Sequence, residues 1–69
     1  AESIWANRKA IALATGANAA TVRAGAYYNI ARIYEAAGQF ADALRHYQLA
    51  KEQKANPVYD TSIERVQNR

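Results

Sequence analysis

The side chains best placed for specific contacts lie in the segment from Tyr28 to Glu35. Tyr28, Arg32 and Glu35 are spaced four and three apart, which puts them on one face if the segment is helical. An arginine offers charge-assisted hydrogen bonds to a carboxylate, and Tyr28 and Asn29 add neutral hydrogen bonds to a peptide backbone. We predict a partner-binding face formed by Tyr28, Asn29, Arg32 and Glu35. The alternative is a solvated face on which Arg32 pairs with Glu35 and Tyr28 covers apolar surface.

The sequence contains no arrangement of side chains that indicates catalysis or metal binding. There are no cysteines, and the single histidine, His46, follows Asp42 by one helical turn. A metal site or acid–base catalysis needs a second ligand or a nucleophile, and neither accompanies this pair, which is typical of a solvated face. We therefore predict a protein that is not an enzyme, with no cofactor, metal ion or small-molecule substrate.

Composition and spacing predict an all-α chain that positions these residues. Roughly a quarter of the residues are alanine, the strongest helix former, and β-branched residues never alternate over the length of a strand. Gly16 and Gly38 are expected to end helices, Asn18 to cap the second helix, and Asn56 to cap the last helix before Pro57. The expected helices are residues 2–14, 19–37, 40–55 and 57–67.

Apolar residues recur at helical spacing in each expected helix. The stripe of the second helix consists of Val22, Ala26, Ile30, Ile33 and Ala37, and that of the third consists of Phe40, Ala43, Leu44, Tyr47 and Ala50. The first helix offers Ile4, Trp5, Ile11 and Leu13, and the last offers Tyr59, Ile63 and Val66. Because the connections are short, consecutive helices are expected to lie antiparallel, as helical hairpins within a single domain.

Residues 24–57 resemble the tetratricopeptide repeat, in which aromatic, large and small residues occupy fixed places within about 34 residues. The matching positions are Tyr27, Ile30, Ala31, Tyr34, Gly38, Ala43, Tyr47 and Ala50. Ala31, Ala43 and Ala50 are small where two helices would cross, which permits close approach of their backbones. Pro57 comes later than the family pattern places it, and the join to a preceding repeat would be longer than usual.

The resemblance implies a right-handed α-solenoid fragment of about four helices. Residues 1–15 would be the helix of a partial repeat, 18–55 a full repeat and 56–69 a capping helix. This layout is similar to the C-terminal end of a short bacterial tetratricopeptide protein. The family implies a non-catalytic scaffold that binds a protein or peptide on the face of its first helices, which here carries Tyr28, Asn29, Arg32 and Glu35.

Trp5 leaves two interpretations open. A core position between the first two helices would bury its large apolar area. An outward position at an unsealed end of the stack would instead favour a structural module that associates with itself. Such contacts between copies would give a homo-oligomer, or a filament where the contact does not close.

Charge and apolar content limit the other partners. The net charge is +3, and the lysines and arginines are spread along the chain between acidic residues, which argues against a nucleic-acid interface. The longest apolar run, residues 10–14, is far shorter than the roughly 18 residues of a membrane span. The lack of cysteine excludes a disulfide framework without indicating a compartment, so localisation is open.

Overall fold

The structure, a computed structural model, describes residues 2–13 and 16–69, and these residues form helices joined by short connections. The helices are α1 (Glu2–Leu13), α2 (Ala19–Ala36), α3 (Phe40–Gln53) and α4 (Pro57–Gln67), and the described residues contain no strand. The prediction of an all-α chain is confirmed, and each predicted end within the described residues lies within two residues of the observed one. Ala14, predicted as the last residue of the first helix, and Thr15, predicted as the first residue of the connection after it, lie outside the described residues.

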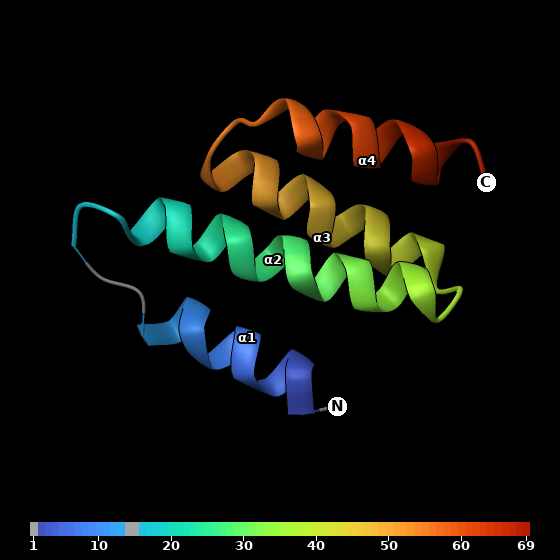
Figure 1. The fold of residues 1–69 in the computed structure, drawn as a ribbon. Coiled ribbons are helices and arrows are strands. Elements are labelled where there is room, and N and C mark those ends of the chain that lie inside the picture. Colours follow the sequence, from blue (N-terminus) through green and yellow to red (C-terminus); the bar gives the residue numbers. More distant parts are fainter. Residues whose placement is uncertain (1, 14–15) are drawn as a thin grey trace.

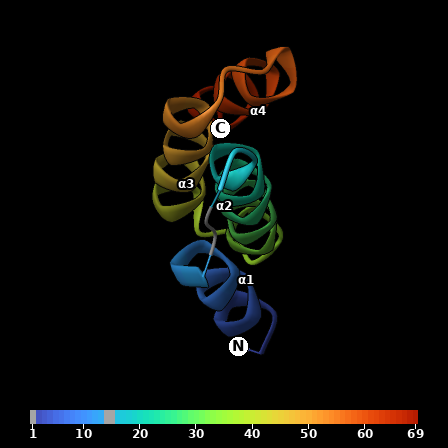
Figure 2. The same ribbon diagram turned by 90° about the vertical axis from the view of Figure 1, so that its left-hand side faces the viewer.

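The helices pack in the order in which they occur in the chain. α1 packs on α2, α2 on α3 and α3 on α4, and the largest of these contacts is between α2 and α3. Figure 1 shows the four helices side by side, with α1 and α4 at opposite ends of the array. In the end-on view, α4 lies above α2 and α3 while α1 lies below them (Figure 2). The extents are 36 × 27 × 12 Å, so few positions are enclosed on every side.

Small residues occupy the places where α2, α3 and α4 meet. Ala31, Ala43 and Ala50 are fully buried, as the sequence predicts for crossing positions. The ring of Tyr47 is also fully buried and packs with Ala31 and Ala43, and Val66 of α4 closes this cluster. α3 therefore packs on α2 through a core of alanines and aromatic rings, and α4 packs against the same core.

Several residues of the predicted apolar stripes are exposed. Val22 of α2 and Ala37, the residue that follows this helix, lie at the surface, so their assignment to a buried stripe is wrong. On α1, Leu13 is also exposed, and no residue from Ser3 onward in this helix is fully buried. The reason is that α1 lies at the edge of the array and has its main contact with α2, so its outward face has no neighbouring helix (Figure 1).

The predicted helix stops and the last cap have the expected backbone geometry. Gly16 and Gly38 have φ angles of +85° and +77°, which glycine adopts without steric cost. The Asn56 side chain accepts a hydrogen bond from the Val58 N–H at 2.9 Å and caps α4. Asn18 lies at the N-cap position of α2, but its side chain makes no capping hydrogen bond. The predicted capping by Asn18 is therefore wrong, because its backbone is not in the extended conformation usual at a cap.

Candidate functional site

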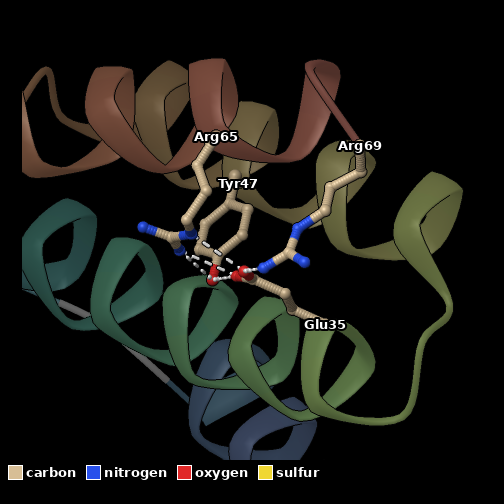
Figure 3. A network of polar contacts seen from close by, with 4 residues as sticks. All are labelled: Glu35, Tyr47, Arg65 and Arg69. Atoms are coloured by element: carbon tan, nitrogen blue, oxygen red, sulfur yellow. Dashed lines mark hydrogen bonds and ion pairs between the residues drawn. The ribbon is translucent and has the colours of Figure 1, made fainter.

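A polar network centred on Glu35 joins α2, α3 and α4. The Glu35 carboxylate accepts a hydrogen bond from the Tyr47 hydroxyl at 2.7 Å and two from Arg65, through Nε and Nη2, each at 2.8 Å. Arg69 Nη2 lies 3.9 Å from the same carboxylate. Figure 3 shows the four side chains meeting between the helices. The two parallel bonds from Arg65 are the bidentate geometry that gives arginine–carboxylate pairs their strength.

The network shifts the pKa values of its members in the directions that favour the observed bonds. The hydrogen bonds from Arg65, helped by Tyr47 and opposed by burial, lower the pKa of Glu35 from 4.5 to about 2. Burial, together with the bond to Glu35, raises the pKa of Tyr47 from 10.0 to about 12. The bond to Glu35 also raises the pKa of Arg65. Near neutral pH, Glu35 and Arg65 are therefore charged while Tyr47 keeps its proton.

The expected ion pair between Arg32 and Glu35 is not formed. Within the described part of the chain, Glu35 pairs with Arg65 and Arg69, whereas the Arg32 guanidinium lies over the Tyr28 ring, 5.8 Å from its centroid. Arg65 approaches from α4 with both donors in line, a geometry that was not visible from the spacing along α2. The interpretation of Arg32 and Glu35 as a local surface pair is therefore wrong.

A cavity of about 340 Å³ opens between α2 and α4 beside this network, and we call it the α4-side cavity. Its lining residues are Arg32, Glu35, Ala36, Tyr47, Arg65 and Arg69. Three arginines face a single glutamate, so the lining carries a net positive charge. Because Glu35 already accepts hydrogen bonds from Tyr47 and Arg65, this cavity favours an anionic group from outside.

A second cavity, of about 430 Å³, lies between α1 and α2, and we call it the α1-side cavity. Its lining residues are Ser3, Asn7, Asn29, Arg32, Ile33 and Ala36. Asn29 Nδ2 donates to Asn7 Oδ1 at 3.4 Å, and Asn7 Nδ2 donates to the Ser3 carbonyl at 2.7 Å. Arg32 and Ala36 line both cavities, so the two adjoin along α2, and we call them together the α2 groove.

The structure places three of the four predicted contact residues on the α2 groove. Arg32 lines both cavities and Asn29 lines the α1-side cavity. Glu35 lines the α4-side cavity, but its carboxylate is engaged by α3 and α4. The predicted binding role therefore stays a prediction for Arg32 and Asn29, while Glu35 has a structural contact that the sequence did not reveal.

Tyr28, the fourth predicted contact residue, packs inside the array and lines neither cavity. Its ring centroid lies 5.7 Å from that of Tyr47 on α3 and 5.4 Å from that of Tyr59 on α4. Tilted rings at these separations are a favourable aromatic arrangement. Tyr28 therefore covers apolar surface, as the alternative interpretation expected. Its ring also contacts the Arg32 guanidinium.

The sequence reasoning missed the four groove residues that lie outside α2 and α3. Arg65 and Arg69 come from the C-terminal part of the chain, and Ser3 and Asn7 come from α1. Arg65 and Asn7 lie off the apolar stripes of their helices, which the sequence shows. Which neighbouring helix these side chains face depends on how the helices cross. The residues next to them in the sequence do not determine that crossing.

Trp5 is exposed, with 65% of its surface accessible, and Lys9 Nζ lies 5.1 Å from its ring centroid. The interpretation of Trp5 as a core anchor is therefore wrong. Its outward position is the one that self-association through α1 requires, and this association stays a prediction.

His46 makes a backbone contact in place of the expected solvated pair with the Asp42 carboxylate. Its Nδ1 lies 2.8 Å from the Asp42 carbonyl oxygen, and its ring packs near Tyr27 and Tyr34, with centroids 6.2 and 5.2 Å away. Within residues 2–13 and 16–69, no three histidine, aspartate, glutamate or cysteine side chains are grouped so as to hold a metal ion. No helix in this part of the chain is both long and apolar enough to cross a membrane.

Comparison of the chain with protein-family models, with curated proteins and with solved structures gives no match. The function of the α2 groove must therefore be argued from its own residues. The half of the groove next to α4 is cationic. The half next to α1 is rich in amides and uncharged except for Arg32, which lines both halves.

Proposed function

We propose that this chain is a non-catalytic protein-interaction scaffold that holds a segment of a partner protein in the α2 groove. The observation that carries the proposal is a groove whose polar side chains are supplied by all the described helices and held by internal contacts. Arg65 is fixed by two bonds to Glu35, and Asn29 is bonded to Asn7. Side chains that are ordered before binding lose less conformational freedom when a partner arrives, so more of the contact energy appears as affinity.

The proposal includes the arrangement of the helices as a fragment of a right-handed, tetratricopeptide-like α-solenoid. Fully buried Ala31, Ala43 and Ala50, at positions where that family has small residues, support it. So does the packing of each helix on its neighbours in the chain. In such an array α2 is the first helix of the full repeat, α4 takes the place of the capping helix, and the α2 groove faces the partner.

Blocking the groove tests this function. Ala36 is exposed and lines both cavities, so Ala36→Trp fills the groove without removing a charge or a core contact. Peptides selected on the wild-type protein from a random display library should bind this variant about tenfold or more weakly, a loss of about 1.4 kcal/mol. Affinity is measured by fluorescence anisotropy, and circular dichroism checks the fold.

Ala41→Trp on α3 is the matched control, because Ala41 is exposed and lines neither cavity. It should leave the affinity of the selected peptides unchanged. Peptides that bind the Ala36→Trp protein as tightly as the wild type would show that binding takes place elsewhere. A selection that enriches no peptide on the wild type also counts against the proposal.

The exposed face of α1 favours a second candidate function, a structural module that forms homo-oligomers or filaments. Trp5 and Leu13 point outward from the edge of the array, with 65% and 66% of their surfaces accessible. Trp5→Asp should abolish a rise of molar mass with concentration in light scattering, whereas Val58→Asp, at an exposed residue of α4, should preserve it. A wild-type protein that stays monomeric at every concentration excludes this function.

A further inference from the structure

The α4-side cavity contains more cationic charge than its own glutamate neutralises. Arg65 directs its Nε and one terminal nitrogen at Glu35. Arg69 approaches Glu35 only to 3.9 Å and lies over the Phe40 ring, 5.4 Å from its centroid. Arg32 lies over Tyr28 in the same way, at 5.8 Å. The attraction between a guanidinium and a ring acts through the charge and uses up none of the five N–H donors.

Arg32 and Arg69 can therefore receive an acceptor from outside the chain. A carboxylate is the matching group, because it is planar, charged and able to take two parallel bonds from one arginine. Repulsion from Glu35 is limited, since Arg65 already neutralises that carboxylate at 2.8 Å. The net charge of +3 of the whole chain also attracts an acidic segment over a longer range.

The α1-side cavity has a different chemistry. Apart from Arg32, its lining consists of uncharged residues, and the amides of Asn7 and Asn29 are its main polar groups. An amide both donates and accepts hydrogen bonds, which suits a peptide backbone or a neutral polar side chain. Once Arg32 has bound one carboxylate, a second charged residue of a partner would lose water here without gaining an opposite charge.

We propose, on the basis of the function proposed above, that the α2 groove selects a partner segment in which an acidic side chain stands beside uncharged polar residues. The carboxylate binds Arg32 and Arg69 in the α4-side cavity. The uncharged part crosses Ala36 and binds the amides of Asn7 and Asn29 in the α1-side cavity. Contacts in both cavities are needed to select this segment.

The test uses two pools of synthetic peptides that differ at one position. Each peptide has randomised neutral residues around a central Asp in one pool and around a central Asn in the other, with an amidated C-terminus. The wild-type protein should bind the Asp pool about tenfold more tightly, the effect expected of a charge-assisted contact. Arg32→Gln and Arg69→Gln should each remove most of this preference. Arg45→Gln, at an exposed arginine of α3 outside both cavities, should leave it intact.

A variant of the α1-side cavity tests the other half of the proposal. Asn29→Leu should weaken binding of both pools by a similar factor, so that their ratio is preserved. A changed ratio would overturn the assignment of the carboxylate to the α4 side. Peptides with a free C-terminus in the Asn pool provide a further comparison, since binding as tight as that of the Asp pool would make a chain terminus, and not a side chain, the ligand.

The outcomes separate this inference from the function on which it rests. If both pools bind equally, and Ala36→Trp abolishes both, the groove binds peptides but the acidic selectivity is wrong. If the preference for Asp survives Ala36→Trp, acidic peptides bind elsewhere, and both the selectivity and the groove assignment are wrong. A preference for Asp that disappears with Ala36→Trp and with both arginine variants supports both.

Discussion

At the scale of single residues, Glu35 holds three helices together through one carboxylate. It accepts bonds from Tyr47 and Arg65, and only 16% of its side-chain surface is accessible. A carboxylate that is partly removed from water and receives several donors costs more to disrupt than an exposed surface pair. The orientation of α4, and with it the shape of the α4-side cavity, depends on this residue.

We predict that Glu35→Gln destabilises the protein. The amide oxygen still accepts a hydrogen bond, but the charge that attracts Arg65 is lost, so the free energy of unfolding at pH 7 should fall by about 2 kcal/mol. Urea denaturation followed by circular dichroism measures the change. Glu64→Gln, at an exposed residue of α4, is the control and should change the stability by less than about 0.5 kcal/mol. Equal urea midpoints for wild type and Glu35→Gln would disprove the structural role of the network.

Glu35 should make the protein less stable in acid, because its pKa is lower in the folded state than in the unfolded state. Its folded-state pKa of about 2 lies below the unfolded value of 4.5, so the unfolded state binds more protons between these values and stability falls as the pH falls through them. The shift corresponds to at most about 3 kcal/mol, and we expect less because 44% of the Arg65 side chain is exposed to solvent. Stability measured from pH 6 to pH 2 should therefore decline more steeply in the wild type than in Glu35→Gln. Parallel curves would contradict this prediction.

At the scale of the helices, two asparagines occupy equivalent N-cap positions with different consequences. Asn56, in an extended conformation before Pro57, bonds to the Val58 N–H and starts α4. Asn18 precedes α2 without such a bond. Pro57 restricts the residue before it to such an extended conformation. α3 ends at Gln53, two residues earlier than predicted, and Lys54 after it already has an extended backbone.

The two caps give a matched pair of substitutions. Asn56→Ala removes a capping hydrogen bond and should lower the free energy of unfolding by about 1 kcal/mol. Asn18→Ala removes no such bond and should change it by less than about 0.5 kcal/mol. Thermal or urea denaturation of both variants under the same conditions makes the comparison. If Asn18→Ala were the more destabilising of the two, the assignment of the caps would be wrong.

At the scale of the whole molecule, the array is thin, and some helices are packed more extensively than others. α2 and α3 share the largest contact and most of the buried residues, whereas α1 has its main contact with α2 and none of comparable size with another helix. An edge helix with no fully buried residue from Ser3 onward gains little apolar stabilisation of its own. The α1-side cavity is therefore bounded on one side by the least stabilised helix, while the α4-side cavity is bounded by the network at Glu35.

Hydrogen exchange should reveal this difference. Amides of α1 should exchange with local opening energies well below those of α2 and α3, because opening α1 breaks few buried contacts. Mass spectrometry of peptic fragments, or NMR, measures the protection of each helix. Equal protection of α1 and α2 in a dilute, monomeric sample would contradict the prediction. Protection of α1 that rises with protein concentration would instead support contact between copies through Trp5.

The local features of the fold could be predicted from the sequence, because they depend on residues within about one helical turn of each other. Gly38, with its positive φ, lies directly after the C-cap of α2, and Asn56 with Pro57 determines where α4 begins. The burial of Ala31 and Ala43 was also predictable, since a small residue between larger apolar ones indicates a crossing. The sequence thus determined the class of fold, the number of helices in the described residues and the helix that carries the groove.

Only the tertiary structure decided which charges meet. Glu35 and Arg65 are 30 residues apart, and nothing in their local sequence pairs them. The spacing of Arg32 and Glu35 on one helix favoured a different partner, and the size of Trp5 favoured a core position that the edge of the array does not provide. A side chain's neighbours on other helices depend on crossing angles and on which helix ends the array. These properties are set by the packing of all four helices together and not by any single segment.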